Sequence, residues 1–403
     1  MNKKISLGLA IALIIVSVTA TFAITMSVSQ RIYNNLITDL PDRAQMYSAV
    51  EEIDEIIRSK YYGEIDQNVL DSNLENGYVK GLGDQYSYYM SAEEYSTYYD
   101  KLEGKSSGVG IETQLDTETG YILVTEVYPG SSAQAAGLKK GDMIIEIAEE
   151  TVDAQNYDEM VQRLSGTRLT SVNVTYRRDD VDKTVSIVLG YSSQTVSYEL
   201  IGTAGYIKIS AFYKTTRSQL EKAVDSLTSQ GAKSLIFDVR GTTEGTIEYT
   251  SRVIDYLVPV ATEGNKAIAT LVDKNGKTVK TYSSDADNVS MPMSVLINSQ
   301  TSGCAELFAC DLRDFGRAVL VGDTTAGNAG VQELFELSNG AAIVLTTSKV
   351  LPYISESYDA VGLEPDTSVS LTAEQQQNLS TLSHEDDIQL QTAIAMLSDN
   401  SEG

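Results

Sequence analysis

The order of short apolar segments and longer amphipathic ones after residue 191 constrains the fold most. Residues 205–210 (GYIKIS) precede the helical pattern RSQLEKAVDSLTSQG, and residues 234–241 (SLIFDVRG) follow it. A helical stretch near 247–257 and the apolar run MPMSVLI (291–297) continue the alternation. Strand, crossover helix and strand in this order predict an α/β domain. We expect RAVLVG, VQELFEL and AAIVLTTSKV to complete its sheet.

The composition pattern changes several times along the 403 residues, and we interpret the chain as multidomain. The expected segments are an N-terminal membrane helix (1–30), a helical segment (31–105), a half-barrel of short strands and glycine turns (106–190), an α/β core (191–372), and a polar tail with a short helix (373–403).

The N-terminus carries Lys3 and Lys4 and then an uncharged run over residues 5–30, longer than the ~20 residues that span a bilayer. We expect an uncleaved single-pass anchor in the cell membrane. The preceding lysines predict a cytoplasmic N-terminus and an extracytoplasmic bulk. The alternative is a signal peptide cut after Ala23, although Thr21-Phe22-Ala23 is a poor cleavage site.

Charge and residue usage exclude several classes of function. A net charge of −26 repels polyanions, so nucleic acid is not an expected partner. With a single histidine, His384, and two cysteines, neither Ser-His-Asp catalysis nor a metal site is expected, and no cofactor is implied. Cys304 and Cys310 fall in one predicted helix about 9 Å apart, too far for a disulfide, so both should be reduced.

Several blocks, in order, resemble the C-terminal processing peptidases, also called tail-specific proteases. The resemblance covers roughly residues 50–369. It implies a PDZ domain followed by a ClpP/crotonase-like α/β core. The blocks are LGDQYSYYMSAEEY, SSGVGIE, SSAQAAGLKKGDMIIEI, GYIKISAF, GAKSLIFDVRG, FGRAVLVGDTTAGNAGVQ and VGLEPD.

The stretch GVGI can be a peptide-binding loop on physical grounds as well. Glycines at the head of a strand can point backbone N–H groups at a terminal carboxylate, while the strand edge pairs with an extended peptide. A helix near residues 158–164 would form the other wall of the groove. We expect polypeptide C-termini or a partner protein to bind here, at Gly108, Val109, Gly110 and Ile111.

The resemblance implies a catalytic serine, a lysine base and a supporting glutamine, yet two of the three are replaced. Counting from Glu306, the nucleophile's place is occupied by Gly303, and the base's place, 25 residues later, by Asn328. Gln332 is retained. Glu244 stands where the family has a glycine that helps form the oxyanion hole, and a carboxylate there would repel an oxyanion.

We therefore expect a pseudopeptidase that binds without cleaving, with no functional catalytic residue. Gly303 should face Asn328 and Gln332 across a cleft, with Glu244 nearby, and Thr301 or Ser302 could cap the following helix. The alternative is a residual or unconventional serine-type endopeptidase that uses Ser302 or Cys304. The sequence leaves open whether the chain forms a homo-oligomer.

Overall fold

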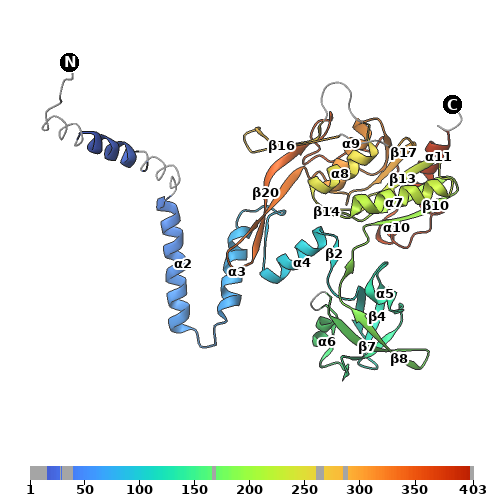
Figure 1. Cartoon of the computed structure of the whole chain (residues 1–403), viewed down its shortest axis with the longest axis horizontal. Coiled ribbons are helices and arrows are strands. Elements are labelled where there is room, and N and C mark those ends of the chain that lie inside the picture. Colours follow the sequence, from blue (N-terminus) through green and yellow to red (C-terminus); the bar gives the residue numbers. More distant parts are fainter. Residues whose placement is uncertain are drawn as a thin grey trace, which may run out of the picture. The chain divides into compact units, whose positions relative to one another are not determined.

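The structure, a computed structural model, describes residues 16–27, 29, 40–165, 169–259, 267–284 and 289–399. The chain divides into two compact units, Met1–Asp71 and Ser72–Gly403. Figure 1 labels the elements along the chain. Its labelled helices are α2 (Leu40–Lys60), α3 (Gln67–Lys80), α4 (Ala92–Leu102), α5 (Ser132–Ala135), α6 (Tyr157–Arg163), α7 (Thr216–Ser229), α8 (Ile247–Leu257), α9 (Cys304–Asp314), α10 (Ala373–Gln377) and α11 (Ile388–Asp399).

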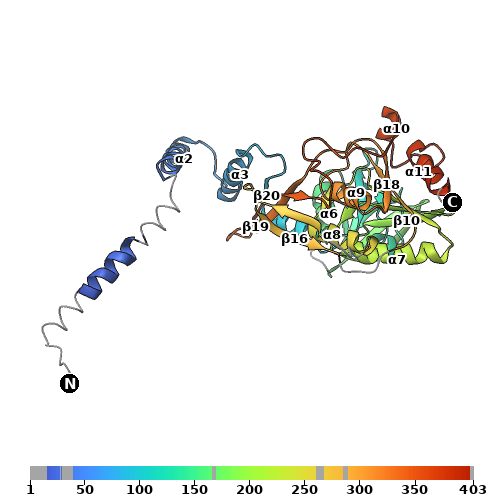
Figure 2. The same ribbon diagram turned by 90° about the horizontal axis from the view of Figure 1, so that it is seen from above.

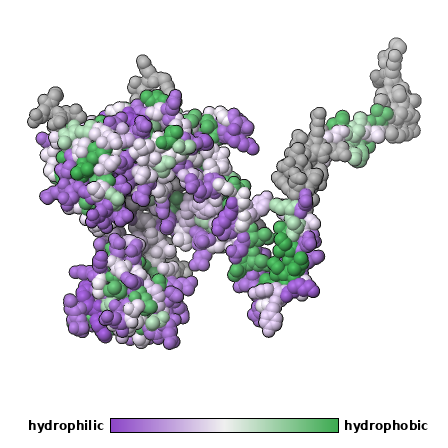
Figure 3. All heavy atoms as spheres, turned by 180° about the vertical axis from the view of Figure 1, so that it is seen from behind, coloured by the Kyte–Doolittle hydropathy of each residue, from purple (hydrophilic) through white to green (hydrophobic). Residues whose placement is uncertain are grey.

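The first unit contains a short apolar helix over residues 16–27 and the longer helix α2. Phe22 and Ile24 are exposed on the first, and Ile53 and Ile56 on the second. Figure 3 shows green, apolar surface on the short helix and on the helical part of the chain that follows it. Among the described residues no helix combines the length and apolarity needed to cross a membrane. Residues 5–15 of the expected span lie outside the described residues, so the anchor stays a prediction.

A sheet of largely parallel strands organises the second unit, as the strand and helix alternation predicts. β10 runs antiparallel to β11, and every other neighbouring pair is parallel. The crossover helices α7, α8 and α9 connect its strands. The strand order is β10 (Val196–Ile201), β11 (Ala204–Ile209), β13 (Ser234–Asp238), β17 (Met293–Ile297), β18 (Ala318–Gly322), β21 (Thr367–Ser368).

Both faces of this sheet are covered, which explains why its central strands are mostly apolar. All five residues of β13 and of β17 are buried. Leu235 and Phe237 of β13 pack on the side of α7, α8 and α9, while Ile236 packs against α11. Figure 2 shows α7 and α8 on one side and α11 on the other. Alternate residues of a strand point to opposite faces, so a sheet covered on both faces favours apolar residues at successive positions.

A second, antiparallel sheet corrects one expectation. VQELFEL and AAIVLTTSKV do not extend the parallel sheet, because β19 and β20 pair with each other and β20 pairs with β15 and β1. The segment 31–105 is therefore not wholly helical, since it supplies β1. The strands are β1 (Tyr88–Met90), β15 (Ala267–Val272), β16 (Thr278–Ser283), β19 (Gly330–Glu336) and β20 (Ala342–Leu351).

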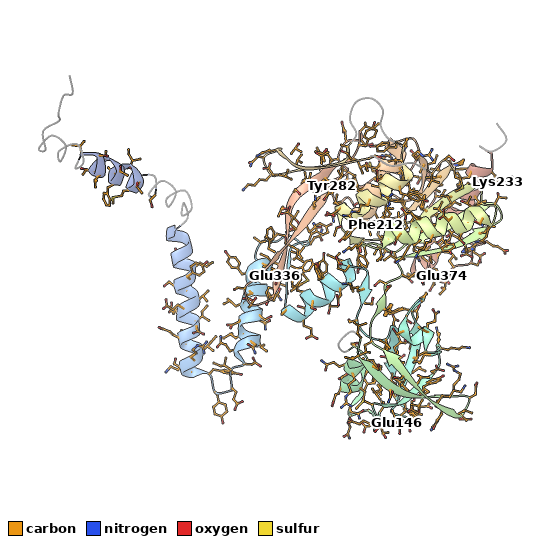
Figure 4. The ribbon with its side chains drawn as sticks, viewed as in Figure 1. Glu146, Phe212, Lys233, Tyr282, Glu336 and Glu374 are labelled. Carbon is orange, nitrogen blue, oxygen red and sulfur yellow. The ribbon has the colours of Figure 1, made fainter. Side chains whose placement is uncertain are left out.

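The residues between two short strands that pair with each other form a separate half-barrel with its own core. Its buried side chains, such as Ile122 and Ile144, contact α5 and α6 rather than the α/β core. Glu146, labelled in Figure 4, belongs to this part of the chain. Its strands are β3 (Ile111–Leu115), β4 (Ile122–Val127), β5 (Met143–Ile147), β6 (Glu150–Thr151), β7 (Ser171–Arg178) and β8 (Val181–Val188), entered and left through β2 (Lys105–Ser106) and β9 (Tyr191–Ser192).

Candidate functional site

A cleft of about 430 Å³ lies where the two sheets and α4 come together. It brings together the predicted catalytic-site positions Glu244, Gly303, Asn328 and Gln332, whereas the predicted peptide-binding loop 108–111 is not part of it. Its lining is mostly neutral and rich in tyrosine. The residues are Gln85, Tyr86, Tyr88, Tyr98, Lys101, Leu102, Tyr213, Thr243, Glu244, Gly245, Thr246, Ile247, Ser302, Gly303, Cys304, Asn328, Gly330, Val331, Gln332 and Val344.

Gly303 occupies the turn between the buried strand β17 and helix α9. Its backbone has φ 62° and ψ −112°, a combination that a residue with a Cβ adopts only under strain. A Cβ placed on Gly303 would have one near neighbour, the Nδ2 atom of Asn328 at 3.6 Å. A side chain here would therefore point into the cleft at Asn328, as a nucleophile facing its base would.

The carboxylate of Glu306 holds the two turns in this position. It accepts the N–H of Gly303 (2.9 Å), of Asn328 (2.8 Å) and of Gly327 (2.7 Å), and also the Thr325 hydroxyl. Glu306 is fully buried. A buried carboxylate needs such donors, because an unpaired charge in the interior is costly. The Glu306 carboxylate of α9 thus fixes the distance between Gly303 and Asn328.

The expected cap of α9 is wrong. Gly303 is itself the residue before the first turn of α9, and its N–H is bound by Glu306. Thr301 instead uses its hydroxyl to donate to the carbonyl of Val239 and to accept the N–H of Asn298, both at 3.0 Å. Its side chain fastens the turn to the neighbouring strand rather than to the helix.

Asn328 is buried and neutral, and its side chain is used within its own turn. Its Oδ1 accepts the N–H of Gly330 at 3.0 Å. Gln332 lies on β19, and its amide donates to the Thr346 hydroxyl at 3.2 Å. Neither amide can take a proton from a hydroxyl as an unprotonated amine does.

Glu244 lies in β14 (Glu244–Gly245), which pairs in parallel with β12 (Ala211–Phe212). Its carboxylate accepts a hydrogen bond from the Tyr213 hydroxyl. Burial and the neighbouring Glu244 raise the pKa of Tyr213, which keeps this hydroxyl protonated. Phe212, labelled in Figure 4, anchors β12 by packing against Phe308 of α9. A negative charge therefore faces the cleft where an oxyanion would need donors.

The two flanking residues differ in accessibility. Cys304 is buried, and burial raises the pKa of its thiol to about 11, so it carries almost no thiolate at neutral pH. Cys304 and Cys310 both lie in α9 and are free, as predicted. Ser302 lines the cleft, and its N–H donates to the carbonyl of Thr242 at 3.0 Å.

The sequence interpretation missed the tyrosines of this site. Tyr88 and Tyr98 come from β1 and α4, and Tyr213 follows β12, so no local spacing joins them. The block LGDQYSYYMSAEEY was singled out for its resemblance, but nothing in it indicated that its tyrosines reach the cleft. Thr325, whose hydroxyl donates to Glu306, was missed for the same reason.

The predicted peptide-binding loop precedes β3 as expected, but one of its donors is already used. Gly108 and Gly110 have φ of 81° and 83°, and the Val109 N–H donates to the carbonyl of Leu164 at 3.0 Å. The loop is therefore fastened to the end of α6. Only part of the expected set of N–H groups can turn to a carboxylate in this conformation.

Metal ligation finds no support in the described part of the chain, where no three or more His, Cys, Asp and Glu residues are grouped to hold an ion. His384 lies 3.4 Å from a Glu199 oxygen and beside the Tyr206 ring, remote in sequence from the cleft residues. Neither observation implies a cofactor.

The fold joins an α/β core to a half-barrel of short strands, and comparisons with known proteins match each part. Residues 203–369 match peptidase family S41, and residues 100–176 match the PDZ domain. The chain therefore carries a PDZ domain followed by an S41 peptidase domain, and both matches confirm its resemblance to the C-terminal processing peptidases.

Named relatives support this resemblance. The carboxy-terminal processing protease CtpA of Bacillus subtilis (strain 168) is 29% identical over 323 residues, 79% of this chain and 67% of the relative. A "Probable CtpA-like serine protease" of Staphylococcus epidermidis is 26% identical over 332 residues, which cover 82% of this chain and 67% of that relative. The crystal structure of a protein assigned to the S41 proteases of Bacteroides fragilis NCTC 9343 has a TM-score of 0.51 at 19% identity, covering 80% of this chain and 90% of that one, and supports the fold.

Proposed function

We propose that this chain is a membrane-anchored, extracytoplasmic pseudopeptidase that binds polypeptide C-termini or a partner protein through its PDZ domain and does not cleave them. The observation that carries the proposal is that Gly303 faces Asn328 across the cleft. A Cβ added to Gly303 would lie 3.6 Å from the side-chain amide nitrogen of Asn328. The frame for a nucleophile and its base is kept, while both reacting groups are absent.

The chemistry of peptide hydrolysis explains why this arrangement supports binding alone. A serine peptidase needs a hydroxyl and a base that takes its proton, and loss of such a nucleophile costs on the order of 10⁶ in kcat. Gly303 has no side chain, the Asn328 amide is not a base, and the Glu244 carboxylate disfavours a negative intermediate.

The location and the partner belong to the same proposal. The lysines before the uncharged N-terminal run favour an anchored chain with its bulk outside the cytoplasm. The PDZ match supports peptide or protein binding, and such domains take up extended peptides along a strand edge.

The second candidate is a residual endopeptidase, and one observation favours it: Ser302 lines the cleft beside Gly303. The position that the family resemblance assigns to the base holds the neutral Asn328. No lysine at that position can therefore activate the Ser302 hydroxyl. Cys304 is the weaker alternative because its buried thiol has its pKa raised to about 11.

The test uses the full chain in a neutral detergent, incubated with an unfolded protein and with peptides that have free C-termini. We expect binding without new fragments by mass spectrometry, and no labelling by a fluorophosphonate probe. Cleavage that scales with protein concentration and disappears in Ser302→Ala or Cys304→Ala would establish the peptidase instead.

A further inference from the structure

One residue of the cleft lining carries a negative charge. Glu244 is the single carboxylate among the lining residues, and it is exposed. Its Oε2 accepts the Tyr213 hydroxyl, which leaves its other oxygen as an acceptor for a ligand. A carboxylate with free acceptor capacity in a partly enclosed cleft attracts a donor that carries positive charge.

Aromatic rings surround this carboxylate. Burial, with a further contribution from the Glu244 charge, raises the pKa of Tyr88 and of Tyr98, and Tyr98 also interacts electrostatically with Tyr213. The three tyrosines come from β1, α4 and the segment after β12, and all line the same cleft. Tyrosine faces carry the negative part of the ring quadrupole, so a cation among them gains a further attraction.

The protein itself supplies little positive charge here. Lys101 is the one Lys or Arg among the lining residues, it is exposed, and no ion pair joins it to Glu244 in the described part of the chain. Asn328 and Gln332, which also line the cleft, have neutral amide side chains. The net charge of −26 over the whole chain also draws cationic peptides toward the surface.

We propose that the cleft around Glu244 binds a basic side chain, lysine or arginine, of a polypeptide, with the Glu244 carboxylate as its counter-ion and the rings of Tyr88, Tyr98 and Tyr213 as its walls. The inference rests on the proposed non-cleaving role, because a ligand is retained only where it is not hydrolysed. It assigns the cleft a selectivity separate from that of the PDZ loop.

The volume and the chemistry fit this class of ligand better than others. About 430 Å³ accommodates a long side chain with its flanking backbone. An acidic side chain would be placed against Glu244, and a purely aliphatic one would leave that carboxylate oxygen without a donor. A basic side chain meets both the carboxylate and the ring faces.

The experiment measures the affinity of the full chain for two fluorescent peptides that differ only in lysine against norleucine. Both peptides have amidated C-termini, so that the PDZ contribution is the same and small. We expect the lysine peptide to bind about tenfold more tightly, as a charge-assisted contact combined with a cation–π contact implies, and this preference to shrink as salt is raised.

Glu244→Gln should reduce the preference to within about twofold, because the side chain keeps its shape and loses its charge. Glu333→Gln is the matched control: it removes the same charge from an exposed residue next to Gln332 that does not line the cleft. Tyr88→Leu should lower the preference as well, through loss of a ring. Unfolding curves of each variant show that it is folded.

Equal affinities for lysine and norleucine peptides, or a preference that survives Glu244→Gln, would overturn the inference. In that case uncleaved peptides with free C-termini would still bind through the PDZ domain and the proposed function would stand. Mass spectrometry of the same samples separates the other failure, since fragments would contradict the non-cleaving role itself.

Discussion

At the scale of one residue, Gly303 stands where the family resemblance places a nucleophile, and Glu306 holds it in position. Glu306 binds the N–H groups of Gly303 and Asn328, so the two turns keep their distance whatever side chains they carry. Because φ is 62°, glycine fits this turn without strain, whereas a nucleophile would be held there at a cost. Glycine at this position therefore supplies no nucleophilic side chain and avoids backbone strain.

Restoring hydrolysis should need Gly303→Ser and Asn328→Lys together, and should gain further from Glu244→Gly. A serine alone lacks a base, and a lysine buried at residue 328 supplies one only if its pKa is lowered by burial. Gly303→Ser alone should stay inactive and lose roughly 1–3 kcal/mol of unfolding free energy through strain. Peptide cleavage and denaturant unfolding measure the two effects. Activity in Gly303→Ser alone would show that another base exists.

Asp311 is a buried acid in α9 that the proposed function does not use. Its Oδ1 accepts the N–H of Tyr353 at 3.0 Å, and its Oδ2 has no hydrogen-bond partner among the described residues. Burial raises the pKa of Asp311 well above its usual value, with a smaller contribution from Asp314. The folded state therefore prefers the protonated acid, and stability falls as pH rises from the ordinary pKa through the raised one.

Asp311→Asn should raise stability at neutral pH by about 1 kcal/mol or more, since one unit of pKa corresponds to about 1.4 kcal/mol. The asparagine keeps the acceptor for Tyr353 and never ionises. At about pH 2.5, well below the ordinary pKa of aspartic acid, this difference should vanish, because Asp311 is then protonated in both states. Thermal unfolding at both pH values measures this, with the exposed Glu333→Gln as control. A gain of equal size at both pH values would contradict ionisation as the cause.

At the scale of elements, a buried ion-pair network attaches the C-terminal helix α11 to the parallel sheet. Arg240 donates to Asp238 (2.6 Å) and to Asp387 (2.7 Å), and also to Gln389 at 2.9 Å. Leu390, Ala393 and Leu397 of α11 then cover the sheet. Apolar packing supplies the buried area of this contact, while the ion-pair network fixes the position at which α11 begins.

Asp387→Ala should loosen α11 and cost about 1–3 kcal/mol, the usual loss for hydrogen bonds to a charged group. Arg240 keeps Asp238 as a partner, so the loss stays below that of an isolated buried charge. Hydrogen exchange of residues 388–399 reports the effect. Asp386→Ala is the control, because that residue is exposed and its carboxylate bonds only locally, to Ser383. Unchanged exchange in Asp387→Ala would assign the attachment to apolar packing alone.

The glycine loop before β3 permits a second prediction at this scale. A Cβ on Gly110 would lie 2.4 Å from the Cβ of Ser131, whereas one on Gly137 would have nothing within 4 Å. Both glycines have positive φ, 83° and 88°. Gly110→Ala should therefore weaken binding of peptides with a free C-terminus relative to amidated ones, and Gly137→Ala should retain that preference. Titration with both peptide forms decides. Equal affinity of the parent chain for the two forms would show that the loop is only a turn.

At the scale of the whole molecule, the proposed anchor sets where the binding domains work. The uncharged run over residues 5–30 is long enough to span hydrocarbon, and its helical part from 16 to 27 exposes apolar side chains. A tethered binding protein gains effective concentration toward ligands at the same membrane surface.

The chain should remain in the membrane fraction after alkaline washing and keep its N-terminal residues. The physical reason is the length of the uncharged run and the poor cleavage site before Ile24. Fractionation followed by N-terminal sequencing measures it. A released protein that begins at Ile24 would contradict the anchor and indicate a signal peptide.

Much of the architecture follows from local patterns. Alternating strands and helices predicted the α/β core, and β13, α7, α8 and β17 lie where their periodicity placed them. The blocks that resemble the peptidase family predicted that Gly303 and Asn328 stand at the catalytic positions, and the structure brings these two residues together. Predictions of strands and helices succeed because their periodicities are properties of consecutive residues.

Tertiary structure alone decided the contacts between distant segments. The sequence by itself determined which residues stand at the family's catalytic positions. It did not show that β19 and β20 leave the parallel sheet, that Glu306 binds both turns, or that Glu244 meets the Tyr213 hydroxyl beside Tyr98. Each depends on pairs of groups far apart in the chain, whose meeting is set by sheet pairing and core packing rather than by any local preference.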